Sequence, residues 1–279
     1  MISLQKERVI LTRLVFIFIL FFLAFRFFIN VTPSHFLQPS LFLLQFDFTY
    51  WIYQLSHIPD VIIKSQAGVI IFDFLLFITC IMSILFPLKR IFIICFSFLF
   101  FIYALSYNMY IVHHAHPLSV MMLITLPFWS SKKENWKLLW EGMRYYICFI
   151  YSASFIWKTI LGTSFFFWNN GINSVKSNLV EYIYYNPHSI TTSILQYLIS
   201  HPAFLNIGSI IVVLLEGLMV VGFFTQRFDK YLMIFPIIIH IATYFFADVF
   251  FIEMLVLIFV FFSGKQIENI SRKIPALAI

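Results

Sequence analysis

The chain has 279 residues, of which 62% are apolar and only 11% are charged, with a formal net charge of +6. Soluble domains carry roughly 25% charged residues, so this composition excludes a water-soluble fold and requires lipid around most of the surface. It predicts an all-α, polytopic membrane helical bundle that forms a single integral membrane domain over residues 1–279. Cys80, Cys95 and Cys148 lie inside apolar runs without metal-ligand spacing, and plain packing is the better interpretation of all three.

Apolar stretches of about 20 residues are long enough to cross a bilayer. The first of them has no small-residue cleavage site, which predicts an anchor and not a removed signal peptide. In chain order we expect eight spans, at residues 9–29, 67–86, 91–112, 113–129, 145–167, 205–224, 231–247 and 249–263. The last two are expected to form a tight hairpin.

Two longer segments, 30–66 and 168–204, are expected on the outer side of the membrane. The first contains the aromatic stretch LFLLQFDFTYWIYQL, which is too polar to span comfortably and is expected to lie at the interface or to form a partial re-entrant helix. The second contains the helix breakers Asn186-Pro187 and His201-Pro202, and it is expected to form two short interfacial helices between such breaks.

The positive charges test this arrangement, because cytoplasmic loops are enriched in lysine and arginine. With eight spans, thirteen of the 18 Lys and Arg residues fall on the side of the two termini, and only Lys64 and Lys176 fall opposite. Arg13, Arg26 and Lys158 lie within spans. Both termini are therefore predicted to be cytoplasmic. Since the basic charge is a topology signal, it does not indicate a nucleic-acid partner.

Three ionisable residues lie near the centres of three different predicted spans: Lys158, Glu216 and His240. A charge at mid-bilayer costs at least about 2.5–3.5 kcal/mol on insertion scales, so each needs a physical reason. Tyr151, Ser154 and Lys158 follow each other at i, i+3 and i+7, which places them on one helix face.

Two interpretations of these residues remain open. In the first, Lys158 and Glu216 form a buried ion pair that fixes helix register, with His240 as a hydrogen-bond partner. In the second, they line a shared polar cavity in which a neutral Lys158 amine acts as a base. A close Glu216 would keep Lys158 protonated and weaken it as a base.

A second polar group lies at the outer end of the predicted span 91–112. It consists of Tyr107, Asn108, His113, His114 and His116, followed by Pro117. It is either an interfacial turn in the headgroup zone or part of a polar cavity. The histidine spacing before a proline is not a tight ligand geometry and no carboxylate lies nearby in sequence, so we predict no metal site.

The segment YYICFIYSASFIWKTILGTSFFFWNNG, residues 145–171, resembles the signature of the horizontally transferred transmembrane family. The best-known members of that family are the vitamin K-dependent gamma-carboxylases. The resemblance rests on Tyr151, Lys158, Trp168 and Gly171. A helix with a buried glutamate, a helix with a histidine and an upstream Asn/His motif, here NMYIVHHAHPLSVMMLITLPF, follow the order of the family.

The resemblance implies that Lys158 deprotonates a quinol of the menaquinol or vitamin K type, assisted by a histidine, for which we favour His114. We add His240 and Glu216 to the candidate catalytic residues. The candidate substrate cavity comprises Tyr151, Ser154, Asn108, His113, His116 and Trp168. Two departures argue against protein glutamate carboxylation. Lys158 and Trp168 are ten residues apart, more than in the carboxylases, and the chain ends soon after the last span, where the carboxylases continue into a lumenal domain.

The sequence thus leaves two functions open. One is carboxylase-like enzymatic deprotonation of a quinol or another lipid-soluble substrate. The other is a non-enzymatic membrane factor for the maturation, export or immunity of a small secreted peptide, as in small bacterial members of the family. Either function is expected in the bacterial cytoplasmic membrane, with the lipid bilayer, and a small peptide or protein substrate, as partners. The oligomeric state is left open.

Overall fold

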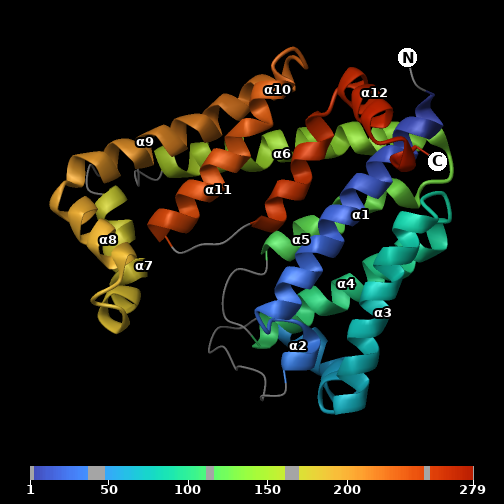
Figure 1. Cartoon of the computed structure of the whole chain (residues 1–279), viewed down its shortest axis with the longest axis horizontal. Helices are drawn as coiled ribbons and strands as arrows, with labels where there is room; N and C mark the ends of the chain where they lie inside the picture. The colour runs from blue at the N-terminus through green and yellow to red at the C-terminus, as the bar shows by residue number, and fades with distance from the viewer. Residues whose placement is uncertain (1–2, 37–47, 111–115, 161–169, 248–251, 279) are drawn as a thin grey trace. The chain divides into compact units, whose positions relative to one another are not determined.

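The computed structural model describes residues 3–36, 48–110, 116–160, 170–247 and 252–278. Over these residues the secondary structure is entirely helical, and no strand is present among them, as the sequence predicts (Figure 1). The chain divides into two compact units. The first unit comprises Met1–Glu141 and Ser263–Ile279, and the second unit comprises Gly142–Phe262.

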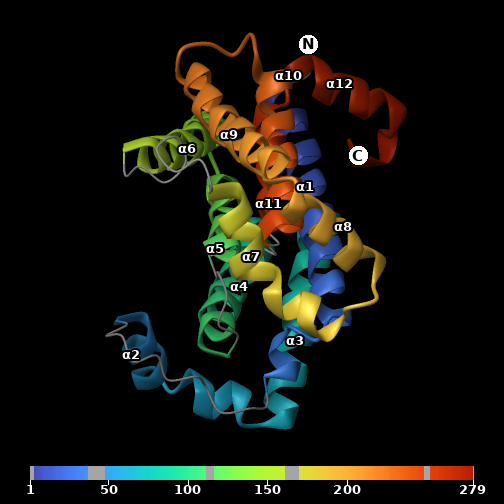
Figure 2. The same ribbon diagram turned by 90° about the vertical axis from the view of Figure 1, so that its left-hand side faces the viewer.

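Three long helices dominate the first unit. Helix α3 packs against both α1 and α4, and Figures 1 and 2 show these three helices in two views. The helices of this unit are α1 (Leu4–Phe28), α2 (Phe48–Leu55), α3 (Gln66–Leu85), α4 (Arg90–Tyr110), α5 (His116–Leu123) and α12 (Gly264–Lys273). Short helical turns join them: η1 (Pro33–His35), η2 (Pro59–Ile63), η3 (Leu126–Trp129) and η6 (Pro275–Leu277).

The second unit is built around α9 and α11, which contact each other and both pack against α7. Its elements are α7 (Asn170–Tyr185), α8 (Ile190–Ser200), α9 (Pro202–Leu218), η4 (Met219–Phe223), α10 (Asp229–Leu232), α11 (Ile234–Ala247) and η5 (Ile252–Phe261). Helix α6 (Lys133–Ile160) contributes its residues from Gly142 onward to this unit. A small apolar core is formed by Val175, Leu179, Leu195 and Leu205.

Serine side chains mark the starts of four helices. Ser3, Ser65, Ser189 and Ser263 each accept a hydrogen bond from a backbone N–H in the first turn of α1, α3, α8 and α12. This satisfies a donor that has no partner within the helix. At α12 the contact is reciprocal, because the Gln266 side chain also accepts from the backbone of Ser263.

Four helical segments are long and apolar enough to cross a membrane: Leu4–His35, Gln66–Leu85, Arg90–Tyr107 and Pro202–Phe223. Their large apolar side chains point outward as well as inward. Phe21 is 65% exposed, and Phe74 and Phe98 are each 64% exposed. Exposed apolar surface on this scale is stable against lipid and not against water. The chain is a membrane protein.

The other four predicted spans do not form long apolar helices within the described residues. Residues 113–129 are divided between the short α5 and η3, and α11 has only 14 residues. Helix α6 begins at Lys133 with a charged first half, so its apolar part up to Ile160 is short. Segment 249–263 contributes a fifth span if Glu253–Phe261 and Gly264–Lys273 count as one broken helix pair. Residues 111–115, 161–169 and 248–251 lie outside the described residues.

Residues 30–66 and 168–204 contain short helices, and the second segment has the helix breaks at the two prolines that the sequence predicts. Helix α2 lies within the aromatic stretch, of which residues 41–47 are outside the described part of the chain. Helices α7 and α8 end next to Asn186 and His201, the residues that precede the two prolines. Proline disfavours helical backbone at the residue before it, which accounts for both breaks.

Arg13 and Arg26 lie in α1 and are held by oxygen acceptors. The guanidinium of Arg13 donates to the carbonyl oxygens of Ile84 and Ala276, at 3.1 and 3.0 Å. Arg26 donates to the hydroxyl of Tyr103 at 2.7 Å and lies over the Tyr107 ring. These contacts indicate a structural role for Arg13 and Arg26, which are two of the three positively charged residues within predicted spans.

Candidate functional site

The candidate site lies within the second unit, where α6 meets α9. Lys158 of α6 donates to Glu216 of α9, with 2.6 Å between Nζ and Oε1. Ser154, one turn before Lys158, donates to the other carboxylate oxygen, Oε2, at 3.2 Å. Glu216 is only 3% exposed, whereas the Lys158 side chain is 32% exposed. The buried carboxylate therefore has a donor on each oxygen, which offsets much of the cost of removing it from water.

A second polar pair joins α6 to α11. The Tyr151 hydroxyl lies 2.7 Å from His240 Nε2, and their rings are 6.0 Å apart. Both side chains are buried, Tyr151 at 4% and His240 at 9% exposed. The face of α6 that carries Tyr151, Ser154 and Lys158 thus holds both pairs, as the helical spacing predicts.

Close packing at Gly217 brings α9 against α6 beside Glu216. A Cβ at Gly217 would lie 2.9 Å from Cδ2 of Phe155, which is closer than such atoms approach. Gly171, the last residue of the motif behind the family resemblance, has the same role between α7 and α9. A Cβ there would overlap the backbone of Leu205. Both glycines allow a close helix approach that a larger residue would prevent.

Arg144 is a buried residue of the second unit. From the sequence it is only one of the thirteen positive charges on the side of the termini. It donates to both carboxylate oxygens of Asp229, at 2.6 and 2.9 Å. It also donates to the carbonyl oxygens of Gly222 and Thr225, at 2.7 and 2.9 Å. Arg144 is 3% exposed, and it ties α6 to the turn between η4 and α10. Nothing in the sequence around Arg144 indicates these contacts, because Asp229 lies 85 residues away.

The remaining predicted site residues cannot be placed against these pairs, because they or their side chains lie outside the described part of the chain. His113, His114 and Trp168 lie outside the described residues. Asn108 and His116 lie in α4 and α5 of the first unit, but their side chains are not among those described. In the described part of the chain, no group of three or more His, Cys, Asp or Glu side chains has a geometry that suits a metal ion.

The arrangement has the groups that move a proton: an amine and a carboxylate in hydrogen-bond contact, a hydroxyl on the carboxylate, and a nearby phenol–imidazole pair. Comparison of the chain with protein-family models, with curated proteins and with solved structures found no match. The residues of the second unit and the resemblance of residues 145–171 to a known family are therefore the two indications of function.

Proposed function

We propose that the chain is an integral membrane protein of the horizontally transferred transmembrane type, located in the bacterial cytoplasmic membrane. Its polar intramembrane site deprotonates a quinol, of the menaquinol or vitamin K type, or another lipid-soluble substrate. The observation that carries this proposal is the 2.6 Å contact between Lys158 and the buried carboxylate of Glu216. The proposed chemistry is the carboxylase-like deprotonation step that the resemblance implies.

The ion pair changes how Lys158 acts. A protonated amine accepts no further proton, so Lys158 must first hand its proton to Glu216. Low polarity around the pair favours this transfer, because it replaces two charges by two neutral groups. The neutral amine then takes the hydroxyl proton of the quinol. The net result is a quinolate beside the Lys158 ammonium, with the added proton on Glu216.

We assign further roles from the hydrogen bonds of the second unit. His240 and Tyr151 form the next hydrogen-bonded pair along α6, and they are placed to relay the proton away from the site. Ser154 orients the carboxylate that receives it.

The distribution of positive charge supports an eight-span topology with both termini in the cytoplasm. Thirteen of the 18 Lys and Arg residues fall on the side of the termini in that arrangement. Since lysine and arginine are enriched in cytoplasmic loops, a distribution this uneven favours the predicted orientation.

The experiment measures the oxidation of menaquinol by dissolved dioxygen, supplied as the electron acceptor, with the purified chain in lipid nanodiscs, because deprotonation makes a quinol easier to oxidise. We expect Lys158→Arg, which keeps the charge but is a far poorer base, to lower the rate by about 10²–10⁴-fold. Thr159→Ser, at the adjoining position of α6, is the matched control and should keep the wild-type rate. An unchanged rate in Lys158→Arg at normal protein abundance would exclude the base role.

The alternative function is a non-enzymatic membrane factor that supports the maturation, export or immunity of a small secreted peptide. It is favoured by the same contact, because a Lys158 amine bound to a buried carboxylate has the geometry of a structural ion pair. Under this alternative, Lys158→Arg retains function and Lys158→Ala lowers only the abundance of the protein. A small peptide encoded by a neighbouring gene and bound by the purified chain would support it.

A further inference from the structure

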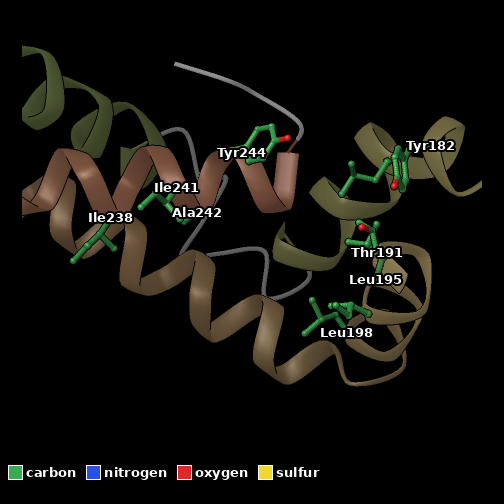
Figure 3. A pocket seen from close by; sticks show the side chains of 10 residues that line it. Tyr182, Thr191, Leu195, Leu198, Ile238, Ile241, Ala242 and Tyr244 are labelled. Carbon is green, nitrogen blue, oxygen red and sulfur yellow. The ribbon is translucent and has the colours of Figure 1, made fainter. Parts of the chain in front are cut away.

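A cavity of about 650 Å³ lies in the second unit, away from the Lys158–Glu216 pair. Side chains of α11 line one side of it, and side chains of α7 and α8 line the other, as Figure 3 shows. Its volume falls within the range of about 300–1,000 Å³ that is typical of small-molecule sites. The lining residues are Leu179, Tyr182, Thr191, Ile194, Leu195, Leu198, Ile238, Ile241, Ala242 and Tyr244.

The chemistry of the lining selects an uncharged, apolar occupant. None of these ten residues is charged, and the only polar side-chain groups among them are the hydroxyls of Tyr182, Thr191 and Tyr244. Leu179 and Leu195 line the cavity and also belong to the buried core of this unit. An anionic or cationic ligand would lose its hydration here without gaining a partner of opposite charge.

The cavity is open to its surroundings. Ile194 is 54% exposed, Ile238 is 43% exposed and Ile241 is 53% exposed, although all three are large and apolar. Ile238 and Ile241 lie in α11, within the predicted span 231–247, and in the proposed topology the medium around this helix is hydrocarbon. The molecules next to such an opening are the acyl chains of bilayer lipids.

We propose that this cavity binds an acyl chain of a bilayer phospholipid as a resident ligand. The chain lies against the isoleucines of α11 and the leucines of α7 and α8. Recognition comes from the hydrocarbon and not from the headgroup, because no lining residue is charged. The site is separate from the quinol chemistry proposed above and does not depend on Lys158.

The test uses the full chain in phosphatidylcholine vesicles that contain a phosphatidylcholine with a photoreactive diazirine on its acyl chain. After illumination, mass spectrometry locates the labelled residues. We expect labelling of Leu195 and Leu198 to exceed that of Phe74, a lipid-facing residue of α3, by about tenfold or more, because a resident chain stays longer than a passing one. Filling the cavity with Ile241→Trp should lower this labelling by a similar factor.

A matched variant controls for the added indole. Ile207→Trp, in α9, replaces a residue that is 48% exposed and does not line the cavity, so labelling should stay at the wild-type level. Cavity labelling no greater than that of Phe74 in the wild-type chain would overturn the proposal, whether or not Ile241→Trp folds. A preference of about tenfold or more for phosphatidylglycerol over phosphatidylcholine would overturn it as well, because it would show headgroup recognition.

Discussion

Lys158 and Glu216 lie 58 residues apart in the sequence and 2.6 Å apart in the fold. Their contact is asymmetric, because the carboxylate is almost fully buried while the lysine side chain is about a third exposed. The carboxylate therefore depends on the lysine more than the lysine depends on it. An unpaired charge at this depth is costly. Removing one partner therefore lowers the free energy of unfolding more than removing both does.

A double-mutant cycle measures this dependence. We expect Lys158→Met to lower the free energy of unfolding by about 1–3 kcal/mol, less than for a fully buried pair because the lysine side chain is about a third exposed. The double variant Lys158→Met, Glu216→Leu should recover most of that loss, because no carboxylate is left buried. Thermal unfolding in detergent gives the values, with Ser154→Ala as the control, which removes one hydrogen bond and should cost about 1 kcal/mol or less. Additive single effects would show that the pair is not coupled in the folded protein.

The sequence predicts these residues better than it predicts their partners. Depth within apolar stretches singles out Lys158, Glu216 and His240, because few ionisable residues lie at the middle of a span. It leaves open which of them are in contact. The pairing of His240 with Tyr151, and not with Lys158, is set by how α6, α9 and α11 pack, and helical periodicity carries no information on packing between helices.

At the scale of the elements, small residues and buried charges determine how the helices of the second unit meet. Gly217 allows α9 to approach Phe155 of α6, and Arg144 joins α6 to the turn before α10. The helix breaks at Asn186 and His201 could be predicted, because proline acts locally. The Arg144 contacts could not, because they join residues distant in sequence.

The close approach at Gly217 predicts a measurable loss of stability. Gly217→Ala places a methyl group 2.9 Å from the Phe155 ring, and overpacking of this kind costs about 1–3 kcal/mol, more than the gain of up to about 1 kcal/mol in helix propensity. Gly208→Ala is the matched control, because nothing lies within 4 Å of a Cβ there in the same helix. Thermal unfolding should therefore show Gly208→Ala at least as stable as the wild type and Gly217→Ala less stable. The reverse order would contradict the close contact.

The geometry of Arg144 requires a guanidinium and not merely a positive charge. Arg144→Lys keeps the charge but cannot bind both Asp229 oxygens and two carbonyl oxygens together. We expect it to lower the free energy of unfolding by about 2–4 kcal/mol, close to the cost of breaking a buried ion pair. Arg227→Lys, at an exposed residue between α9 and α11, should have no measurable effect. Equal unfolding temperatures for the two variants would exclude this role of Arg144.

At the scale of the whole molecule, composition and periodicity predict a helical membrane protein correctly. The number of spans is harder to predict from the sequence. A helix such as α6 continues from a charged segment into an apolar one, so its ends do not coincide with the ends of the apolar stretch. Length and apolarity alone therefore identify four spans, or five with the broken pair, among the described residues. The charge distribution is the independent observation that favours eight.

The proposed topology is tested by labelling single cysteines with a membrane-impermeant maleimide, in a chain whose three native cysteines have been replaced. Lys64→Cys is expected to react in intact spheroplasts, because residue 64 lies on the outer side in the eight-span arrangement. Lys230→Cys should react only after the membrane is opened. Labelling of both in intact spheroplasts would contradict the eight-span arrangement.

In the proposed mechanism, Glu216 receives the proton of Lys158 when a quinol is deprotonated beside this pair. Infrared difference spectroscopy of the chain in nanodiscs, recorded as menaquinol is added, detects this directly. The proposed mechanism predicts a new protonated-carboxyl band in the wild-type spectrum that is missing in Glu216→Gln. A wild-type spectrum without that band, recorded with menaquinol bound, would contradict proton transfer at this pair.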